Sequence, residues 1–254
     1  MIFYFTATGN SLYVARLLTE NPISIPQALK GRELKFSDES IGIVAPVYAG
    51  ELPKIVREFL EKSTFQTDYF YMVLTYGNDD TVAARWSADF AAQCGVHVDY
   101  VHTIRMVDNY LPAFDMNEQS AKEHQIEHEI DTVKSAVQNR ARHIPKAGLR
   151  SKMLYKTVQH MFAQHPERIN GSAIAITDRC VACGVCTRVC PRGLYVLENG
   201  KATRTQNSCD FCLACVHHCP SKAIGLTPSE RNPEARFRNE HVSLEDIIAA
   251  NHQL

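Results

Sequence analysis

Eight of the nine cysteines lie within residues 180–219, where one spacing pattern occurs twice. The first copy has Cys180, Cys183, Cys186 and Cys190 and ends at Pro191, and the second has Cys209, Cys212, Cys215 and Cys219 and ends at Pro220. In this spacing, three thiolates bind one [4Fe–4S] cluster and the fourth binds a second cluster. The repeat therefore predicts that this part of the chain folds around two [4Fe–4S] clusters.

The fourth cysteine of each copy is predicted to bind the cluster of the other copy. Short loops can direct the first three sulfurs into one hollow, whereas the cysteine before the proline lies past a turn and faces away. The predicted ligands of cluster I are Cys180, Cys183, Cys186 and Cys219, and those of cluster II are Cys209, Cys212, Cys215 and Cys190. Structural zinc is the alternative, but zinc sites usually have paired C-x2-C units without a third cysteine and a Cys-Pro step.

The composition is that of an ordinary globular protein. With 254 residues, 45% of them hydrophobic, the chain can form one or two domains with real cores. A net charge of −1 gives no general reason to expect nucleic acid or an anionic membrane as a partner. The first residues lack the features of a signal peptide, and no segment has the apolar length of a membrane span. Clustered thiols without an export signal predict a cytoplasmic protein, because the cytoplasm keeps thiols reduced.

Strands and helices are predicted to alternate through the N-terminal half. The predicted strands are residues 2–5, 41–48, 69–75 and 97–106, with a further strand near 23–25 or 34–36. The predicted helices are residues 11–20, 52–62 and 80–94. This order predicts an α/β fold with a doubly wound, parallel, five-stranded sheet.

A polar turn joins the first predicted strand to the first predicted helix. It has the sequence Thr6-Ala7-Thr8-Gly9-Asn10-Ser11. A helix N-terminus offers unpaired N–H groups and the positive end of a dipole, and the polar side chains add further donors. Gly9 is expected to let the backbone approach a ligand closely. The turn therefore predicts a phosphate site, with an ordinary helix N-cap as the alternative.

This turn resembles the FMN-phosphate loop of flavodoxins, written roughly (Ser/Thr)-x-Thr-Gly-(Asn/Thr)-(Ser/Thr). Thr6, Thr8, Gly9, Asn10 and Ser11 match it position by position. Flavodoxins have the strand order 2-1-3-4-5 and bind FMN at the carboxyl ends of strands 1 and 3. The further FMN-binding residues that the resemblance implies are Pro46, Val47, Tyr48, Ala49, Gly50, Thr75, Tyr76, Gly77 and Asn78. Tyr48 is similar to the aromatic residue that stacks on the flavin ring, and a half-buried packing tyrosine is the alternative.

The whole chain resembles a family of fusions between an N-terminal flavodoxin-like domain and a C-terminal, bacterial-type two-cluster ferredoxin. Members occur chiefly in anaerobic bacteria and are thought to move electrons. The resemblance covers residues 1 to about 110 and 171 to about 227, and the helices between them are not part of it. We predict a flavodoxin-like FMN domain at 1–143, a helical linker at 144–170, a small α+β ferredoxin domain at 171–228 and a tail with a short helix at 229–254. Residues 97–106 run on without the insertion that splits the fifth strand of long-chain flavodoxins, which implies a flavin pocket of the short-chain kind.

Three further helices complete the prediction. One long helix is expected at 117–143, another at 149–165 between the two halves, and a capped one near 243–250. His124 and His128 stand four residues apart and could hold a metal, although exposed helical histidines are commoner. Cys94 is expected to be a buried, inert thiol.

The function that these features imply is electron transfer between two [4Fe–4S] clusters and FMN. Two alternatives stay open. One is a flavin reductase acting on a small molecule, with Tyr76, Tyr110 and His102 as candidate proton donors. The other is a docking module whose clusters are structural. Asp79 and Asp80 are expected to disfavour a negatively charged flavin, and no G-x-G-x-x-G dinucleotide fingerprint occurs.

A redox protein is the expected partner. Arg179, Arg188, Arg192 and Arg204 flank the cluster motifs and would give them a positive rim. Opposite charges speed the encounter of two proteins, so this rim favours an acidic ferredoxin that delivers electrons to the clusters. The alternative is that these arginines are ordinary solvated surface.

Overall fold

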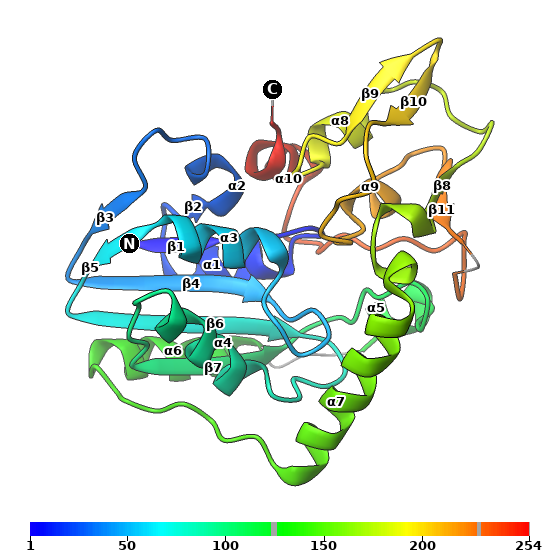
Figure 1. Ribbon diagram of the computed structural model, residues 1–254. Coiled ribbons are helices and arrows are strands. Elements are labelled where there is room, and N and C mark those ends of the chain that lie inside the picture. Colours follow the sequence, from blue (N-terminus) through cyan, green and yellow to red (C-terminus); the bar gives the residue numbers. More distant parts are fainter. Residues whose placement is uncertain (123–125, 228–229, 254) are drawn as a thin grey trace.

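The computed structural model describes residues 1–122, 126–227 and 230–253. Its N-terminal part is a parallel five-stranded sheet between two layers of helices (Figure 1). The strands of this sheet are β1 (Ile2–Tyr4), β2 (Ile23–Ser24), β4 (Ser40–Pro46), β6 (Tyr69–Tyr76) and β7 (Tyr100–Arg105). Their spatial order, β2-β1-β4-β6-β7, is the flavodoxin-like order 2-1-3-4-5. The predicted fold class is therefore confirmed.

Each face of the sheet packs on its own hydrophobic core, which explains the continuous apolar runs in the sequence. In β6, Tyr69, Tyr71 and Val73 belong to one core, whereas the alternating Phe70 and Met72 belong to the other. The first core includes residues of α1 (Asn10–Leu18) and α6 (Ile126–Gln138), and the second core includes residues of α3 (Lys54–Lys62) and α4 (Ala83–Gln93). No described helix is long and apolar enough to cross a membrane.

Both segments that were considered for the second strand form strands, but only one joins the large sheet. β2 pairs with β1, and the helix α2 (Ile25–Ala28) follows it at once. β3 (Lys35–Ser37) instead pairs with β5 (Thr64–Gln66) in a separate two-stranded parallel sheet. The second core continues into this small sheet through Phe36 and Phe65, which pack against Phe3.

The prediction of one long helix at 117–143 was wrong. α5 (Met116–Ser120) is a separate short helix, and α6 ends at Gln138. Arg140 has a left-handed φ of 50°, which turns the chain back towards the sheet. His143 then forms an isolated bridge with Tyr100 on the edge strand β7, so backbone pairing at the edge replaces further helix. His124 lies outside the described residues.

The cysteine-rich part is built from small hairpins and short helices at one end of the sheet. The arrowheads of β4 and β6 point towards it and towards α7 in Figure 1. Its elements are η1 (Pro166–Ile169), η2 (Gly171–Ala173), β8 (Ile174–Ile176), α8 (Val185–Val189), β9 (Tyr195–Glu198), β10 (Lys201–Arg204), α9 (Ala214–His217) and β11 (Ile224–Leu226). β8 pairs with β11 and β9 with β10, both antiparallel. Val185, Val189 and Ala214 lie in the same core as α1, so the two parts pack as one body.

The predicted helices at 149–165 and near 243–250 are confirmed as α7 (Leu149–Gln164) and α10 (Leu244–Asn251). Ser243 begins α10 with a capping box to Asp246, and Asp246 also pairs with Arg16 of α1. The side-chain amide of Asn251 donates to the backbone oxygen of Thr6 at 3.0 Å. The C-terminal tail therefore returns across the molecule to the first turn of the sheet.

Candidate functional site

The first three cysteines of the first copy share a small cavity with the last cysteine of the second copy. Cys180, Cys183, Cys186 and Cys219 all line this cavity. Burial, followed by the nearby Cys183, Cys180 and Cys219, raises the pKa of the Cys186 thiol to about 11. Cys180 and Cys183 come from the loop before α8, Cys186 from α8 itself and Cys219 from the loop before β11. Four is the number of cysteine ligands that one [4Fe–4S] cluster takes.

The other four cysteines, Cys190, Cys209, Cys212 and Cys215, also lie near one another. Burial, followed by Cys190 and Cys209 among its neighbours, raises the pKa of the Cys215 thiol. Burial also raises the pKa of the Cys212 thiol, and Cys190 and Cys215 raise it further. Cys190 thus lies with the three cysteines of the second copy, although it belongs to the first. Buried thiols of raised pKa lose their protons when a metal binds them, because the ligand is the thiolate.

Hydrogen-bond donors point at the sulfurs of both groups. The backbone N–H groups of Ala202 and Ala223 donate to Cys180 and Cys219 at 3.3 and 3.2 Å. Those of Leu194 and Phe211 donate to Cys190 and Cys209 at 3.4 and 3.3 Å. Such N–H···S bonds stabilise thiolate ligands and tune the potential of a cluster, so the surroundings of both groups fit one.

The second group has one further donor. The buried Tyr195 hydroxyl donates to the sulfur of Cys215 at 3.2 Å. Tyr195 stands five residues after Cys190, and Ile224 stands five residues after Cys219. At this matched position the two halves of the repeat therefore differ. The second group has the hydroxyl of Tyr195 beside it, and the other half has the aliphatic Ile224.

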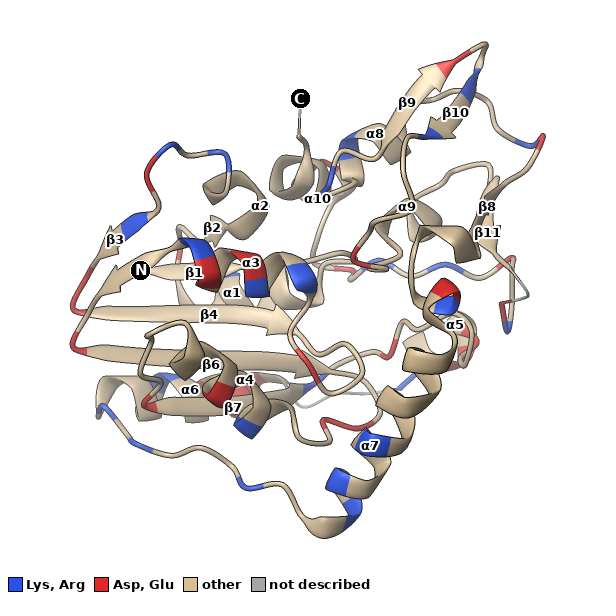
Figure 2. Ribbon diagram, viewed as in Figure 1, with Lys and Arg blue, Asp and Glu red and all other residues tan. Residues whose placement is uncertain are grey.

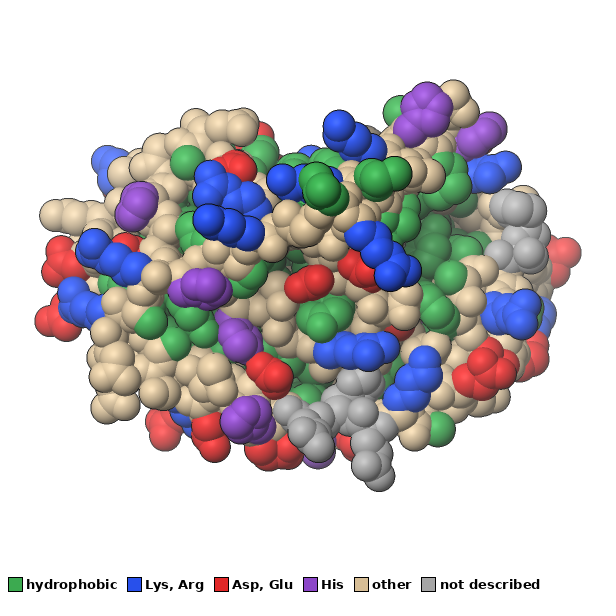
Figure 3. Space-filling view, turned by 90° about the horizontal axis from the view of Figure 1, so that it is seen from below, with side chains coloured by type: hydrophobic (Ala, Val, Ile, Leu, Met, Phe, Trp, Pro, Cys, Tyr) green, Lys and Arg blue, Asp and Glu red, His purple; other side chains and the backbone are tan. Residues whose placement is uncertain are grey.

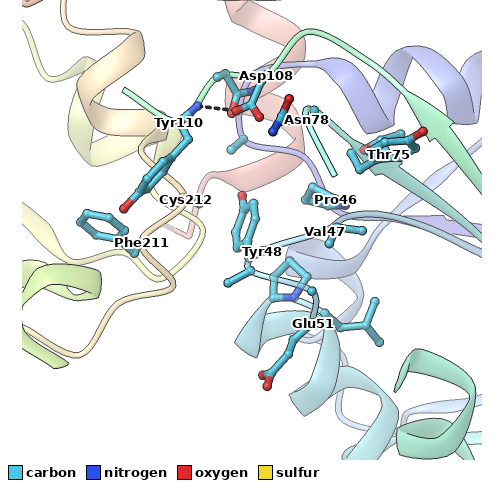
Figure 4. A pocket seen from close by; sticks show the side chains of 18 of the residues that line it. Pro46, Val47, Tyr48, Glu51, Thr75, Asn78, Asp108, Tyr110, Phe211 and Cys212 are labelled. Carbon is cyan, nitrogen blue, oxygen red and sulfur yellow. Dashed lines mark hydrogen bonds between the residues drawn. The ribbon is translucent and has the colours of Figure 1, made fainter. Parts of the chain in front are cut away.

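A cavity of about 480 Å³ opens where the carboxyl ends of the sheet strands meet the cysteine-rich part. Thirteen of the fourteen predicted FMN-binding residues line it: Thr6, Thr8, Asn10, Ser11, Pro46, Val47, Tyr48, Ala49, Gly50, Thr75, Tyr76, Gly77 and Asn78. Figure 4 shows Pro46, Val47 and Thr75 on the sheet side of this cavity and Phe211 and Cys212 on the other. The fold thus brings the three turns singled out in the sequence to a single site.

Gly9 is the predicted residue that does not line the cavity. Its φ of 106° is left-handed, and a Cβ placed on it would lie only 2.8 Å from the Cβ of Asn239 and 3.0 Å from that of Val242. The close approach that requires glycine here is therefore to the C-terminal tail. Asn239 also donates from its backbone N–H to the backbone oxygen of Thr8 at 2.8 Å.

The polar turn keeps donors available for an anion. The hydroxyls of Ser11 and Thr75 lie 2.8 Å apart, and one shared proton leaves the other hydroxyl free to donate. Asn109 donates to the Thr8 oxygen at 2.6 Å, which leaves the Thr8 proton free as well. The N–H groups in the first turn of α1 have no carbonyl within the helix. These donors fit a phosphate group without help from a cation.

Tyr48 is held by a tight turn between the two parts of the molecule. Tyr48 and Glu51 exchange two backbone hydrogen bonds of 2.9 and 3.1 Å. Ala49 and Gly50 between them have φ of 54° and 86°, as in a type I′ turn. Burial, followed by the neighbouring Cys212 and Asp210, raises the pKa of the Tyr48 phenol well above its usual value. Tyr48 therefore stands between the turns at the carboxyl ends of the strands and the cysteine loop.

Asp210 joins the cysteine loop to α3. Its buried carboxylate accepts from the backbone N–H of Ile55 at 2.7 Å, where the N-cap of α3 is Pro53 and has no side-chain acceptor. Arg192 pairs with Asp210 and with Glu58 of α3. Arg192 is thus a half-buried internal cation, and its assignment to a positive rim around the cluster motifs was wrong.

His217 ties three segments together beside the cavity. Its Nδ1 accepts from the backbone N–H of Phe237 at 3.2 Å, and its Nε2 lies 3.0 Å from the backbone oxygen of Asn109. Burial lowers the pKa of His217 to about 3, so the ring is neutral and donates from Nε2 to Asn109. The loop after β7, α9 and the tail are fixed to each other through this ring.

Three walls of the cavity were not predicted from the sequence: Val107 to Tyr110 after β7, Asp210 to Leu213 beside the cysteines, and one side of α7. The first could have been found, because β7 ends at the same edge of the sheet as β1 and β4. Of the candidate proton donors, Tyr76 and Tyr110 line the cavity. His102 does not, because its Nε2 lies 2.6 Å from Glu129 of α6.

The prediction that Cys94 is a buried, inert thiol is confirmed in part. Cys94 ends α4 and is half-buried rather than fully buried. Burial raises the pKa of its thiol, which disfavours the reactive thiolate at neutral pH.

Comparison with known proteins places the cysteine-rich part in a family. Residues 162–224 match the family of 4Fe–4S dicluster domains. An uncharacterized ferredoxin of Methanocaldococcus jannaschii is 35% identical over 68 residues, which are 24% of this chain and 42% of the relative. Subunit I of the NAD(P)H-quinone oxidoreductase of Gloeobacter violaceus is 34% identical over 84 residues, 28% of this chain and 40% of the relative.

A third relative matches this chain over a shorter stretch. Ferredoxin-2 of Desulfomicrobium norvegicum is 52% identical over 31 residues, 12% of this chain and 52% of the relative. The chain thus spans about half or less of the length of each of these relatives. The C-terminal half of this protein therefore contains a 4Fe–4S dicluster domain of the ferredoxin type, joined to a doubly wound α/β sheet.

Proposed function

We propose that this protein transfers electrons between two [4Fe–4S] clusters and an FMN bound in the 480 Å³ cavity. When bound, a [4Fe–4S] cluster exchanges one electron at a time and FMN exchanges one or two. The observation that carries the proposal is the wall of this cavity. One side holds the polar turn and Tyr48, and the other holds Cys212 of the dicluster domain.

The proposed cluster ligands are the two groups of cysteines that the fold assembles. Cys180, Cys183, Cys186 and Cys219 would hold cluster I, which lies towards solvent because Cys183 is exposed. Cys209, Cys212, Cys215 and Cys190 would hold cluster II, whose Cys212 also lines the cavity. In this arrangement cluster II would lie between cluster I and the flavin site. An electron entering at the exposed cluster would thus have a short path inwards.

The proposed role of the α/β part is to hold and insulate FMN. The first turn of α1, with Thr8 and Ser11, would bind the phosphate, and the turn that carries Tyr48 would place an aromatic ring beside the flavin. Asp79 and Asp108 line the same cavity, and their carboxylates would disfavour the anionic form of a reduced flavin ring. Burial raises the pKa of Asp108, whose carboxylate accepts from the backbone N–H of Tyr110 at 3.1 Å (Figure 4).

Anaerobic purification tests the proposal directly. We expect about eight iron atoms per chain from two [4Fe–4S] clusters and one FMN, measured by metal analysis and by extraction of the flavin. Both should be reduced by dithionite, with the clusters followed by electron paramagnetic resonance. Zinc in place of iron, or iron without flavin, would contradict the proposal.

Tyr195 offers a second expected result. We predict that Tyr195→Phe lowers the reduction potential of cluster II, because an O–H···S bond to Cys215 stabilises the more negative, reduced state. A hydrogen bond contributes about 1 kcal/mol, which corresponds to roughly 40 mV for a one-electron couple. A redox titration followed by electron paramagnetic resonance measures the shift.

The other cluster is the internal control for this measurement. Cluster I has Ile224 at the matched position and should keep its potential in Tyr195→Phe. Equal shifts in both clusters, or no shift in either, would show that the Tyr195 hydroxyl does not tune cluster II.

A further inference from the structure

One long stretch of the chain has no acidic residue, and it includes the whole of α7. Residues 132–166 contain seven lysines and arginines and no aspartate or glutamate. The net charge of the whole chain is only −1, so this stretch is a local concentration of positive charge. Figure 2 shows blue segments, and no red ones, on the lower part of α7 and on the chain that leads to it.

Four of these cations project from α7 or from the segment just before it. Lys146, Arg150, Lys152 and Lys156 are all exposed. Among the ion pairs of the described residues, Arg140 pairs with Glu39 and Arg142 with Asp99, whereas none includes these four. Their charges are therefore not neutralised within the described part of the molecule.

Two large apolar side chains are exposed among the four cations. Leu149 is 82% exposed and Met153 is 71% exposed, and they stand one turn apart on α7. We call Lys146, Leu149, Arg150, Lys152, Met153 and Lys156 the α7 surface. Figure 3 views the molecule from the side on which α7 begins and shows blue side chains beside green ones over this face.

The cluster motifs offer less free positive charge than their arginines suggest. Arg192 is paired with Glu58 and Asp210, and Arg179 lies 3.3 Å from Glu234. Among the arginines near the clusters, only Arg188 and Arg204 remain outside the ion pairs of the described residues. Among the described residues, the α7 surface thus carries four cations outside the ion pairs, whereas two of the four arginines that flank the cluster motifs are paired.

The opposite side of α7 forms a wall of the flavin cavity. Leu154, Tyr155, Val158 and Phe162 line that cavity. The Tyr155 hydroxyl donates to Glu51 at 2.7 Å, and the Gln159 side chain donates to the backbone oxygen of Ala49 at 3.0 Å. A protein docked on the α7 surface would therefore be separated from the cavity by the thickness of one helix.

We propose that the α7 surface is the docking site of a small acidic electron-carrier protein that exchanges electrons with the flavin site. This proposal rests on the proposed function and names its partner by charge. Electron-transfer encounters bury little area and rely on complementary charge, and a few cations around a small apolar centre suit that kind of contact. A membrane surface fits less well, because it needs a broad apolar helix face and most apolar residues of α7 face the cavity.

The test compares two variants of equal charge change in the full-length protein. The first variant reverses three cations of the α7 surface: Lys146→Glu, Lys152→Glu and Lys156→Glu. The control variant reverses three exposed cations away from α7: Arg32→Glu in the loop before β3, Lys35→Glu on β3 and Lys134→Glu on α6. The probe is an acidic two-cluster ferredoxin, and its dissociation constant is measured by titration calorimetry at roughly 0.02 M and 0.5 M salt.

We expect the α7 variant to bind the ferredoxin at least tenfold more weakly than the control variant at low salt, and the difference to vanish at high salt. Equal affinities of the two variants, or no measurable binding of the unmodified protein at low salt, would overturn the proposal. So would charge-dependent binding to vesicles containing phosphatidylglycerol with unchanged ferredoxin affinity, because the surface would then serve a membrane.

The outcome also separates this proposal from the proposed function. Binding is measured without electron transfer, and iron and flavin content are determined on the same samples. A protein without flavin whose ferredoxin affinity still depends on α7 would refute the flavin assignment and keep the docking site. A fully loaded protein with equal affinities in both variants would keep the function and refute the docking site.

Discussion

Replacing Cys190 with serine is expected to destroy cluster II and leave cluster I in place, although Cys190 belongs to the first copy of the cysteine pattern. The physical reason is position, because Cys190 lies near Cys209, Cys212 and Cys215, the three cysteines of the second copy. Iron content should fall from about eight to about four atoms per chain. The measurement is iron analysis with electron paramagnetic resonance of the reduced protein under anaerobic conditions.

Reference variants identify which cluster is lost. Cys212→Ser removes a ligand of cluster II and Cys183→Ser a ligand of cluster I, each from the middle of its copy. The spectrum of Cys190→Ser should match that of Cys212→Ser, and the spectrum of Cys219→Ser should match that of Cys183→Ser. The reverse pairing would mean that each copy binds its own cluster and that the crossed assignment is wrong.

Replacing Ser11 with aspartate is expected to abolish FMN binding while both clusters remain. Ser11 lines the cavity in the first turn of α1, so the new carboxylate would stand where the phosphate is proposed to bind. Juxtaposed like charges cost several kcal/mol, which corresponds to an affinity at least about 100-fold lower. The helix N-terminus favours a carboxylate, so the fold is expected to tolerate the change. Flavin content and the dissociation constant for added FMN measure the effect.

Ser11→Ala is the matched control, because it removes the hydroxyl without adding charge. It should weaken FMN binding by about tenfold or less, as expected for one lost hydrogen bond. Flavin affinity that is equal in the two variants would place the phosphate elsewhere. A substitution at Gly9 is a poorer test, because a side chain there would collide with Asn239 and Val242 of the tail before it reached the cavity.

Local patterns in the sequence were sufficient to predict most of the sheet and its turns. Alternating apolar residues such as Tyr71 and Met72 face opposite cores, so a strand buried on both sides is visible as a continuous apolar run. The order of strands and helices then fixes which turns meet at one edge. The failure at 117–143 has a different cause, because the end of α6 depends on the pairing of His143 with Tyr100 on another strand.

The wall between the cavity and the cysteine-rich part could not be predicted in this way. Its position depends on single contacts between distant residues, such as the carboxylate of Asp210 on the N–H of Ile55. The residues around Asp210 give no indication that its partner is Ile55, which lies 155 residues earlier in the chain. The same limit led to the wrong assignment of Arg192, whose charge is neutralised by Glu58.

The contacts between the tail and the polar turn also set an order of events during synthesis. Asn10 and its partner Asn239 are 229 residues apart, and Thr6 and Asn251 are 245 residues apart. A ribosome completes the whole cysteine-rich segment before these partners emerge, so a nascent chain can fold its cysteine-rich part while the polar turn is still uncovered. Contacts of such long range form slowly because the closure of a long loop costs chain entropy. The polar turn is thus synthesised first, and its contacts with the tail form last.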